Sequence, residues 1–169
     1  MKKITINLLI LLFIYSCSSV KSTQKAINSG DYDSAINTAV ENLRKNKTRK
    51  GNQPYIPMLE EAYKKAVERD LARIEYLKKD GNSENIEVIY NLFLKLSARQ
   101  ELIKPLLPLR STANGVEAYF TFKNYTNDIV AYKNELSEFL YAKAKNSFNT
   151  TNKLDFRRIY DHLMYIDKI

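Results

Sequence analysis

The chain has 169 residues, with 27 lysines and arginines against 19 aspartates and glutamates, and a formal net charge of +8 at pH 7. A single cysteine excludes an internal disulfide, and a single histidine excludes a histidine-rich metal site. Basic residues are interleaved with acidic ones along most of the chain, which argues against nucleic-acid binding.

Residues 1–16 have the order of an export signal. Lys2 and Lys3 form a basic start, and an apolar stretch centred on Leu8 to Tyr15 follows. This stretch is well short of the roughly 20 residues that cross a bilayer as a helix. We therefore expect residues 1–16 to be a cleaved signal peptide rather than a permanent membrane anchor.

The only cysteine follows this signal, and Ile14-Tyr15-Ser16-Cys17 resembles the lipobox of bacterial lipoproteins. The resemblance implies cleavage before Cys17, a diacylglycerol on its sulfur and an acyl chain on the freed amine. Because two or more chains hold a protein stably on a membrane, we expect residues 17–169 to be lipid-anchored in the cell envelope, at the periplasmic face of the outer membrane. The alternatives are an ordinary secretory signal with an incidental cysteine and a buried free cysteine.

A helical hairpin is expected over residues 20–46. The first helix ends near Ile27, Gly30 breaks it, and a second helix follows with apolar residues at helical spacing. These apolar residues are Tyr32, Ala35, Ile36, Ala39, Val40 and Leu43.

The segment Gly30-Asp31-Tyr32-Asp33-Ser34-Ala35-Ile36 resembles the turn and second-helix start of a tetratricopeptide repeat. The resemblance covers about one repeat, and a weaker echo occurs at Asp155-Phe156-Arg157-Arg158-Ile159-Tyr160. It implies antiparallel helix hairpins that offer a groove to a protein or peptide partner. Generic packing of amphipathic helices is the alternative explanation of the apolar pattern in both segments.

One run of basic residues interrupts the even mixing of charges, from Arg44 to Lys50. In an exported protein such a run favours a solvated loop attracted to anionic lipid headgroups or cell-wall polymers. The candidate binding residues in it are Arg44, Lys45, Lys47, Arg49 and Lys50.

Four further helices are expected, over residues 57–79, 84–103, 128–147 and 154–168. The first has the strongest pattern, because Pro57 suits a first helical position and apolar residues recur at helical spacing after it. Its expected i,i+4 ion pairs are Glu60 with Lys64, Glu61 with Lys65 and Glu75 with Lys79.

Residues 106–124 have a different pattern. Val116, Ala118, Phe120 and Phe122 alternate with polar residues or tyrosine, and period two indicates a strand. With Asn114-Gly115 in the connection, a small β-hairpin inserted among the helices is expected. The predicted fold is thus a single, mainly α domain of tetratricopeptide-like antiparallel hairpins with this one insertion.

Tyrosine is abundant, with 12 residues. Tyr63, Tyr90 and Tyr132 fall on predicted apolar faces and are expected to pack between helices with a wet hydroxyl. The expected surface tyrosines are Tyr119, Tyr125, Tyr141 and Tyr165.

Groups that carry catalytic chemistry are sparse. The only histidine, His162, lies in the last predicted helix, where a packing or surface role is expected. The chain has no Gly-x-Ser-x-Gly elbow and no glycine-rich phosphate loop. Two carboxylate pairs, Glu60 with Glu61 and Glu84 with Glu87, are the nearest acid–base candidates, but helical positions favour solvated faces and caps. We expect no enzyme activity, no cofactor and no metal.

These patterns together favour a lipid-anchored envelope protein that acts as a non-catalytic binding or scaffold module for a protein or peptide partner. The alternative is a structural envelope protein whose basic segment binds an anionic cell-wall polymer or the membrane surface. An unrecognised hydrolase is the third reading.

Overall fold

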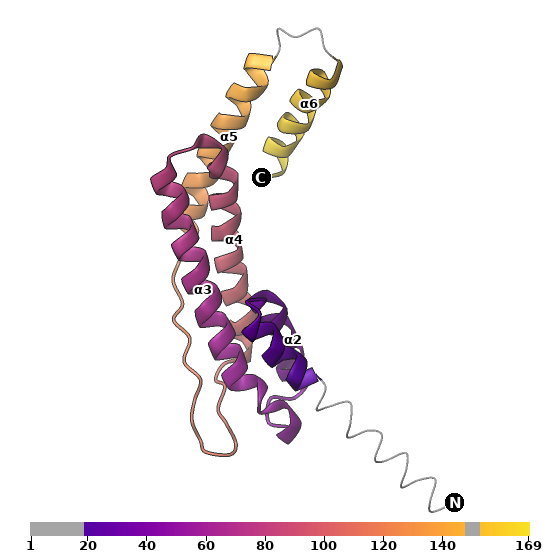
Figure 1. The fold of residues 1–169 in the computed structure, drawn as a ribbon, viewed down its shortest axis with the longest axis vertical. Coiled ribbons are helices and arrows are strands. Elements are labelled where there is room, and N and C mark those ends of the chain that lie inside the picture. Colours follow the sequence, from indigo (N-terminus) through magenta and orange to yellow (C-terminus); the bar gives the residue numbers. More distant parts are fainter. Residues whose placement is uncertain (1–18, 148–152) are drawn as a thin grey trace, which may run out of the picture. The chain divides into compact units, whose positions relative to one another are not determined.

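A computed structural model describes residues 19–147 and 153–169 of the chain (Figure 1). The described chain is mainly α-helical, which confirms the predicted fold class. The predicted signal, residues 1–16, and Cys17 lie outside the described residues. None of the helices described is long and apolar enough to cross a membrane.

A helical segment over residues 19–28 comes first, and the remaining elements follow in chain order. They are α2 (Tyr32–Lys45), the 3-10 turn η1 (Lys50–Asn52), α3 (Tyr55–Asp80), the 3-10 turn η2 (Ser83–Asn85), α4 (Ile86–Ile103), the 3-10 turn η3 (Lys104–Leu106), α5 (Thr126–Ser147) and α6 (Lys153–Lys168). The chain divides into two compact units: unit 1 takes residues up to Arg69 together with Arg99–Phe122, and unit 2 takes Asp70–Ala98 together with Lys123–Ile169.

Unit 1 opens with a helix–turn–helix whose turn depends on Gly30. This residue has a φ of 82°, a left-handed conformation that glycine adopts without a steric penalty. The Gly30 N–H donates to the Ile27 carbonyl and the Asp31 N–H to the Ala26 carbonyl, which is the Schellman pattern that ends a helix. Asp31 then caps α2, because its carboxylate accepts the Ser34 N–H at 3.2 Å.

The tetratricopeptide-like arrangement expected from this turn is not confirmed. Ala35 is buried as a small residue between helices should be, but α3 has 26 residues, α4 has 18 and α5 has 22. Helices of such unequal length do not form the succession of equal pairs that defines a repeat array.

The core of unit 1 brings together the apolar faces of the helical segment 19–28, α2, the start of α3 and the region around η3. Its fully buried large side chains include Ile27, Ile36, Leu43, Leu59, Ile103 and Leu109. The face of α2 that the sequence predicted, with Ala39 and Val40 among its residues, is buried in this core.

The β-hairpin expected around residues 106–124 is not seen. In the part of the chain that the structure describes, this region has a single antiparallel bridge, Arg110 with Glu117, instead of two strands. Ala118, Phe120 and Phe122 do face the core of unit 1, whereas Val116 is 61% exposed, so the alternation indicated buried side chains at three of its four positions but not a strand. Two short strands alone are marginal, and here α3 rather than a second strand supplies the packing surface.

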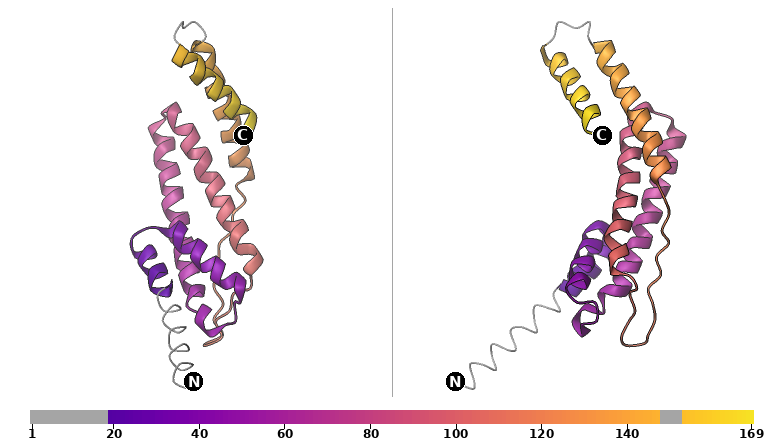
Figure 2. Two further views of the ribbon diagram at one scale, coloured as in Figure 1. Left: turned by 90° about the vertical axis from the view of Figure 1, so that its right-hand side faces the viewer. Right: turned by 180° about the vertical axis from the view of Figure 1, so that it is seen from behind.

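Unit 2 has its own apolar cluster. Ile86, Tyr90, Leu136 and Leu140 are buried in it, and partly buried residues of α5 and α6 surround them. Helices α5 and α6 lie side by side and run in opposite directions (Figure 2). On α6, Ile159 is buried, whereas Tyr160 is exposed.

Tyr125 is buried in unit 2 with only 4% of its surface exposed, so its expected place on the surface is wrong. Its ring lies 5.9 Å from the ring of Phe93. Burial, aided by the charge of Asp128, raises the pKa of Tyr125 above its ordinary value of 10.0.

The raised pKa of Tyr125 gives a pH-dependent stability. The folded chain favours the protonated phenol, so this contribution is complete below about pH 10 and is lost as the pH rises through the folded-state pKa. We expect the Tyr125→Phe variant to lose less stability than the parent between pH 9 and pH 11 in urea unfolding followed by circular dichroism. A parent and variant with parallel pH profiles would contradict this assignment.

Candidate functional site

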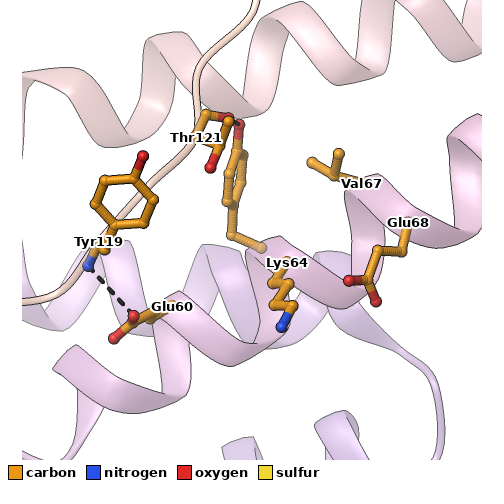
Figure 3. A pocket seen from close by; sticks show the side chains of 7 residues that line it. Glu60, Lys64, Val67, Glu68, Tyr119 and Thr121 are labelled. Atoms are coloured by element: carbon orange, nitrogen blue, oxygen red, sulfur yellow. Dashed lines mark hydrogen bonds between the residues drawn. The ribbon is translucent and has the colours of Figure 1, made fainter.

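A hollow of about 400 Å³ lies on unit 1, between α3 and the extended chain that follows the Arg110–Glu117 bridge (Figure 3). Seven residues line it: Glu60, Tyr63, Lys64, Val67, Glu68, Tyr119 and Thr121. Five of them come from α3 at helical spacing, and two come from the extended chain.

The inner wall of the hollow is built on Tyr63, which is 4% exposed. Its hydroxyl donates to the Thr121 carbonyl at 2.9 Å, which holds the extended chain against α3. The ring of Tyr63 meets Phe120 and Phe122 edge-on, at centroid distances of 5.6 and 5.9 Å. Tyr63 is packed as expected, but against the extended chain rather than a second helix, and its hydroxyl is bonded to a backbone carbonyl rather than to water.

The rim of the hollow depends on Glu60. Its carboxylate accepts the Tyr119 N–H at 3.2 Å (Figure 3). This bond holds the backbone of Tyr119 in place, while the residue as a whole stays 76% exposed. The prediction that Tyr119 lies at the surface is confirmed, and its ring stands beside the hollow as a large amphipathic contact.

Only one of the three expected i,i+4 ion pairs of this helix is formed within the described residues. Lys65 contacts Glu61 at 2.7 Å, and this hydrogen bond raises the pKa of Lys65. Glu60 is bonded to the Tyr119 backbone instead of Lys64. The exposed amine of Lys64 therefore faces solvent at the edge of the hollow, where it can meet a ligand.

The two carboxylate pairs considered for acid–base chemistry are engaged elsewhere. Glu61 holds Lys65 as above, and in unit 2 the carboxylate of Glu84 accepts from Lys143 at 2.8 and 3.0 Å. Glu87 lies beside Tyr165, whose pKa is raised mainly by burial and further by that carboxylate. In residues 19–147 and 153–169, no three histidine, cysteine, aspartate or glutamate side chains gather as a metal site. The half-exposed His162 lies on α6.

The basic segment of residues 44–50, called the basic loop below, has a defined structure: Arg44 and Lys45 end α2, a turn follows, and Lys50 begins η1. The side-chain oxygen of Asn46 accepts three hydrogen bonds, from the N–H and hydroxyl of Thr48 and the N–H of Arg49. Asn52, which is 8% exposed, donates to the carbonyls of Asn42 and Asn46, both at 2.8 Å. These bonds fix the backbone that carries the cations.

The five basic candidates differ in what they do. Lys47 donates to the carbonyls of Leu106 and Pro108 at 3.0 and 3.1 Å, and Arg44 donates to the Leu102 carbonyl at 3.4 Å. Both cations thus cap carbonyls at the C-terminal end of α4 and η3, where positive charge is favourable. The exposed cations that remain for a ligand are Lys45, Arg49 and Lys50.

A second polar cluster of unit 1 was not predicted. Asp33 accepts from Arg99 at 2.7 Å and lies 3.6 Å from Arg69, whose guanidinium covers the ring of Tyr32 at 5.3 Å. Arg99 is only 4% exposed. The available signal was its position three residues after Leu96, on the apolar face of the predicted helix, because a cation there requires a partner.

No protein-family model, curated protein or solved structure matches the chain.

Proposed function

We propose that this chain is a lipid-anchored envelope protein that holds a protein or peptide partner in the hollow of unit 1 without converting it chemically. The anchor part of the proposal comes from the order of the signal and from Cys17 in its lipobox-like position. The binding part comes from the geometry of the hollow.

The exposed Tyr119 is the observation that carries the binding part. A tyrosine ring of this exposure, on a backbone held to α3 through Glu60 and Tyr63, is an amphipathic contact of the kind enriched at interface hot spots. Val67 adds apolar surface, and Lys64 and Glu68 add charges of both signs. This lining suits a side chain with an apolar body and a charged or polar end, presented by a peptide segment.

The residues that line the hollow favour binding over catalysis. They include no histidine, cysteine or serine, and the one carboxylate bonded within the site, Glu60, accepts from a backbone amide. A nucleophile with an adjacent base, the usual arrangement for covalent catalysis, is not present among these seven side chains.

The anchor is tested by mass spectrometry of the mature N-terminus from membrane fractions. We expect the chain to begin at Cys17 and to carry two or three acyl chains. An unmodified chain in the soluble fraction would overturn the anchor.

The hollow is tested by a photo-crosslinking residue placed at Tyr119 in cells, with the same residue at Tyr141 of unit 2 as a matched exposed tyrosine, 60% exposed. We expect one defined adduct from position 119 and none of that mass from position 141. A Val67→Asp change, which puts a charge on the apolar wall, should reduce that adduct at least fivefold. An adduct that survives this change, or that forms equally from both positions, would contradict the proposed site.

A further inference from the structure

The first described residues of unit 1 lie near the basic loop. The hydroxyl of Tyr55 donates to the Ser19 Oγ at 2.9 Å, so the start of the described chain lies against the first turn of α3. Tyr55 is 2% exposed and lies five residues after Lys50, where the basic loop ends. Ser19 and the loop therefore share the N-terminal end of α3.

The proposed lipid attachment must be close to the same end. One residue, Ser18, separates Cys17 from Ser19, and these two steps along the chain span at most about 7 Å even when fully extended. A membrane that holds lipid on Cys17 is thus within reach of the end of unit 1 that carries the basic loop.

The charged side chains of the basic loop are all positive. No aspartate or glutamate occurs between Glu41 and Glu60, whereas the segment contains five lysines and arginines. The side chains of Lys45, Arg49 and Lys50 are exposed and make no hydrogen bond or ion pair with any residue in the described part of the chain.

The loop is also rigid enough to present these cations together. The side-chain amide of Gln53 donates to the Lys47 carbonyl at 2.6 Å, and its oxygen accepts the Thr112 N–H at 2.7 Å. With the bonds of Asn46 and Asn52, this ties the loop to α2 and to the 111–115 turn. Little ordering is then required of the backbone when the cations meet a surface.

We propose that Lys45, Arg49 and Lys50 are a second membrane contact, which docks unit 1 on anionic headgroups of the leaflet that holds the lipid of Cys17. This inference rests on the proposed anchor. Each lysine or arginine near an anionic surface strengthens association by about fivefold, so three together strengthen docking by about a hundredfold. The anchor keeps the loop at the surface, so the docking step is intramolecular.

The test uses the purified full-length lipoprotein in vesicles, after mass spectrometry has established lipid on Cys17. An environment-sensitive dye on an Ala113→Cys variant reports the 111–115 turn, and headgroup-labelled quencher lipid reports its proximity to the bilayer. We expect strong quenching in vesicles of phosphatidylcholine with 30% phosphatidylglycerol, and weak quenching in pure phosphatidylcholine or in 0.5 M salt, where charges are screened.

Two triple variants separate this docking from general charge. Lys45→Gln with Arg49→Gln and Lys50→Gln should lower the docking equilibrium by about a hundredfold. Lys79→Gln with Lys95→Gln and Lys145→Gln, the same charge change at exposed positions of unit 2, should lower it less than about threefold. Equal effects of the two triples, or equal quenching in both vesicle types, would overturn the docking.

Absent lipid on Cys17 overturns the anchor, and is seen before the docking assay. Soluble alginate tests the cell-wall alternative. Alginate is added to the protein in anionic vesicles, and dye quenching is measured. If alginate abolishes the quenching at concentrations that do not change how quenching depends on salt, the loop prefers a polysaccharide and the proposed membrane contact is wrong.

Discussion

Replacing Leu59 with alanine is expected to lower the free energy of unfolding by about 2 to 5 kcal/mol. Leu59 has no exposed surface and lies in the core of unit 1 with Leu43 and Ile103. The truncation removes apolar contacts and leaves a cavity that the neighbouring helices close only in part. Urea unfolding followed by circular dichroism at 222 nm measures the loss.

Two controls separate the cavity from other effects of this change. Leu59→Met keeps the volume and should cost less than about 1.5 kcal/mol. Leu94→Ala removes the same atoms from a residue that is 38% exposed, and should cost less than the Leu59 change. A Leu59→Ala loss below about 1 kcal/mol would place Leu59 outside a packed core.

Replacing Asp33 with alanine is the second large change, with an expected loss of about 1 to 3 kcal/mol. Asp33 accepts from Arg99, whose side chain is 5% exposed, and lies beside Arg69. Because the carboxylate itself is 46% exposed, solvent screens part of the attraction, and the loss is smaller than for a fully buried pair.

Asp31 is the matched control for this ion pair, because it lies two residues away and has the same side chain. Its carboxylate caps α2, so Asp31→Ala should cost about 1 kcal/mol through the lost cap. In a double-mutant cycle with Arg99→Met, the Asp33 change should show coupling of at least about 0.5 kcal/mol, and the Asp31 change should not. Additive losses for Asp33 and Arg99 would show that their contact contributes nothing to stability.

The helices could be predicted from the sequence because their signals are local. Gly30 ends the first helix with a positive φ, Asp31 caps the second, and Gly81 follows α3, which ends at Asp80. The apolar positions of α2 recur at helical spacing and are buried as expected. Such signals depend on residues within one or two helical turns of each other, so contacts with distant parts of the chain do not easily change the helix boundaries that they set.

The site could be predicted only in part, because its contacts join residues far apart in the chain. The Tyr63 hydroxyl donates to the Thr121 carbonyl, 58 residues away in sequence, and Lys47 donates to the Leu106 carbonyl, 59 residues away. Period two near Phe120 predicted a strand that is not formed, because the pattern could not show that α3 would take the place of a partner strand. The basic run likewise indicated five available cations, whereas capping occupies Arg44 and Lys47.

The extended chain that lines the hollow, residues 119–122, is held in place by hydrogen bonds from side chains rather than by a backbone ladder. The Ala118 N–H donates to the Leu109 carbonyl, but the Tyr119 N–H depends on Glu60, and the Thr121 carbonyl depends on Tyr63. Amides held this way exchange with solvent more readily than amides inside a helix. A partner seated in the hollow would cover this wall, so occupancy would be recorded as slowed hydrogen exchange at residues 119–122, and part of the binding free energy would go into ordering the protein itself.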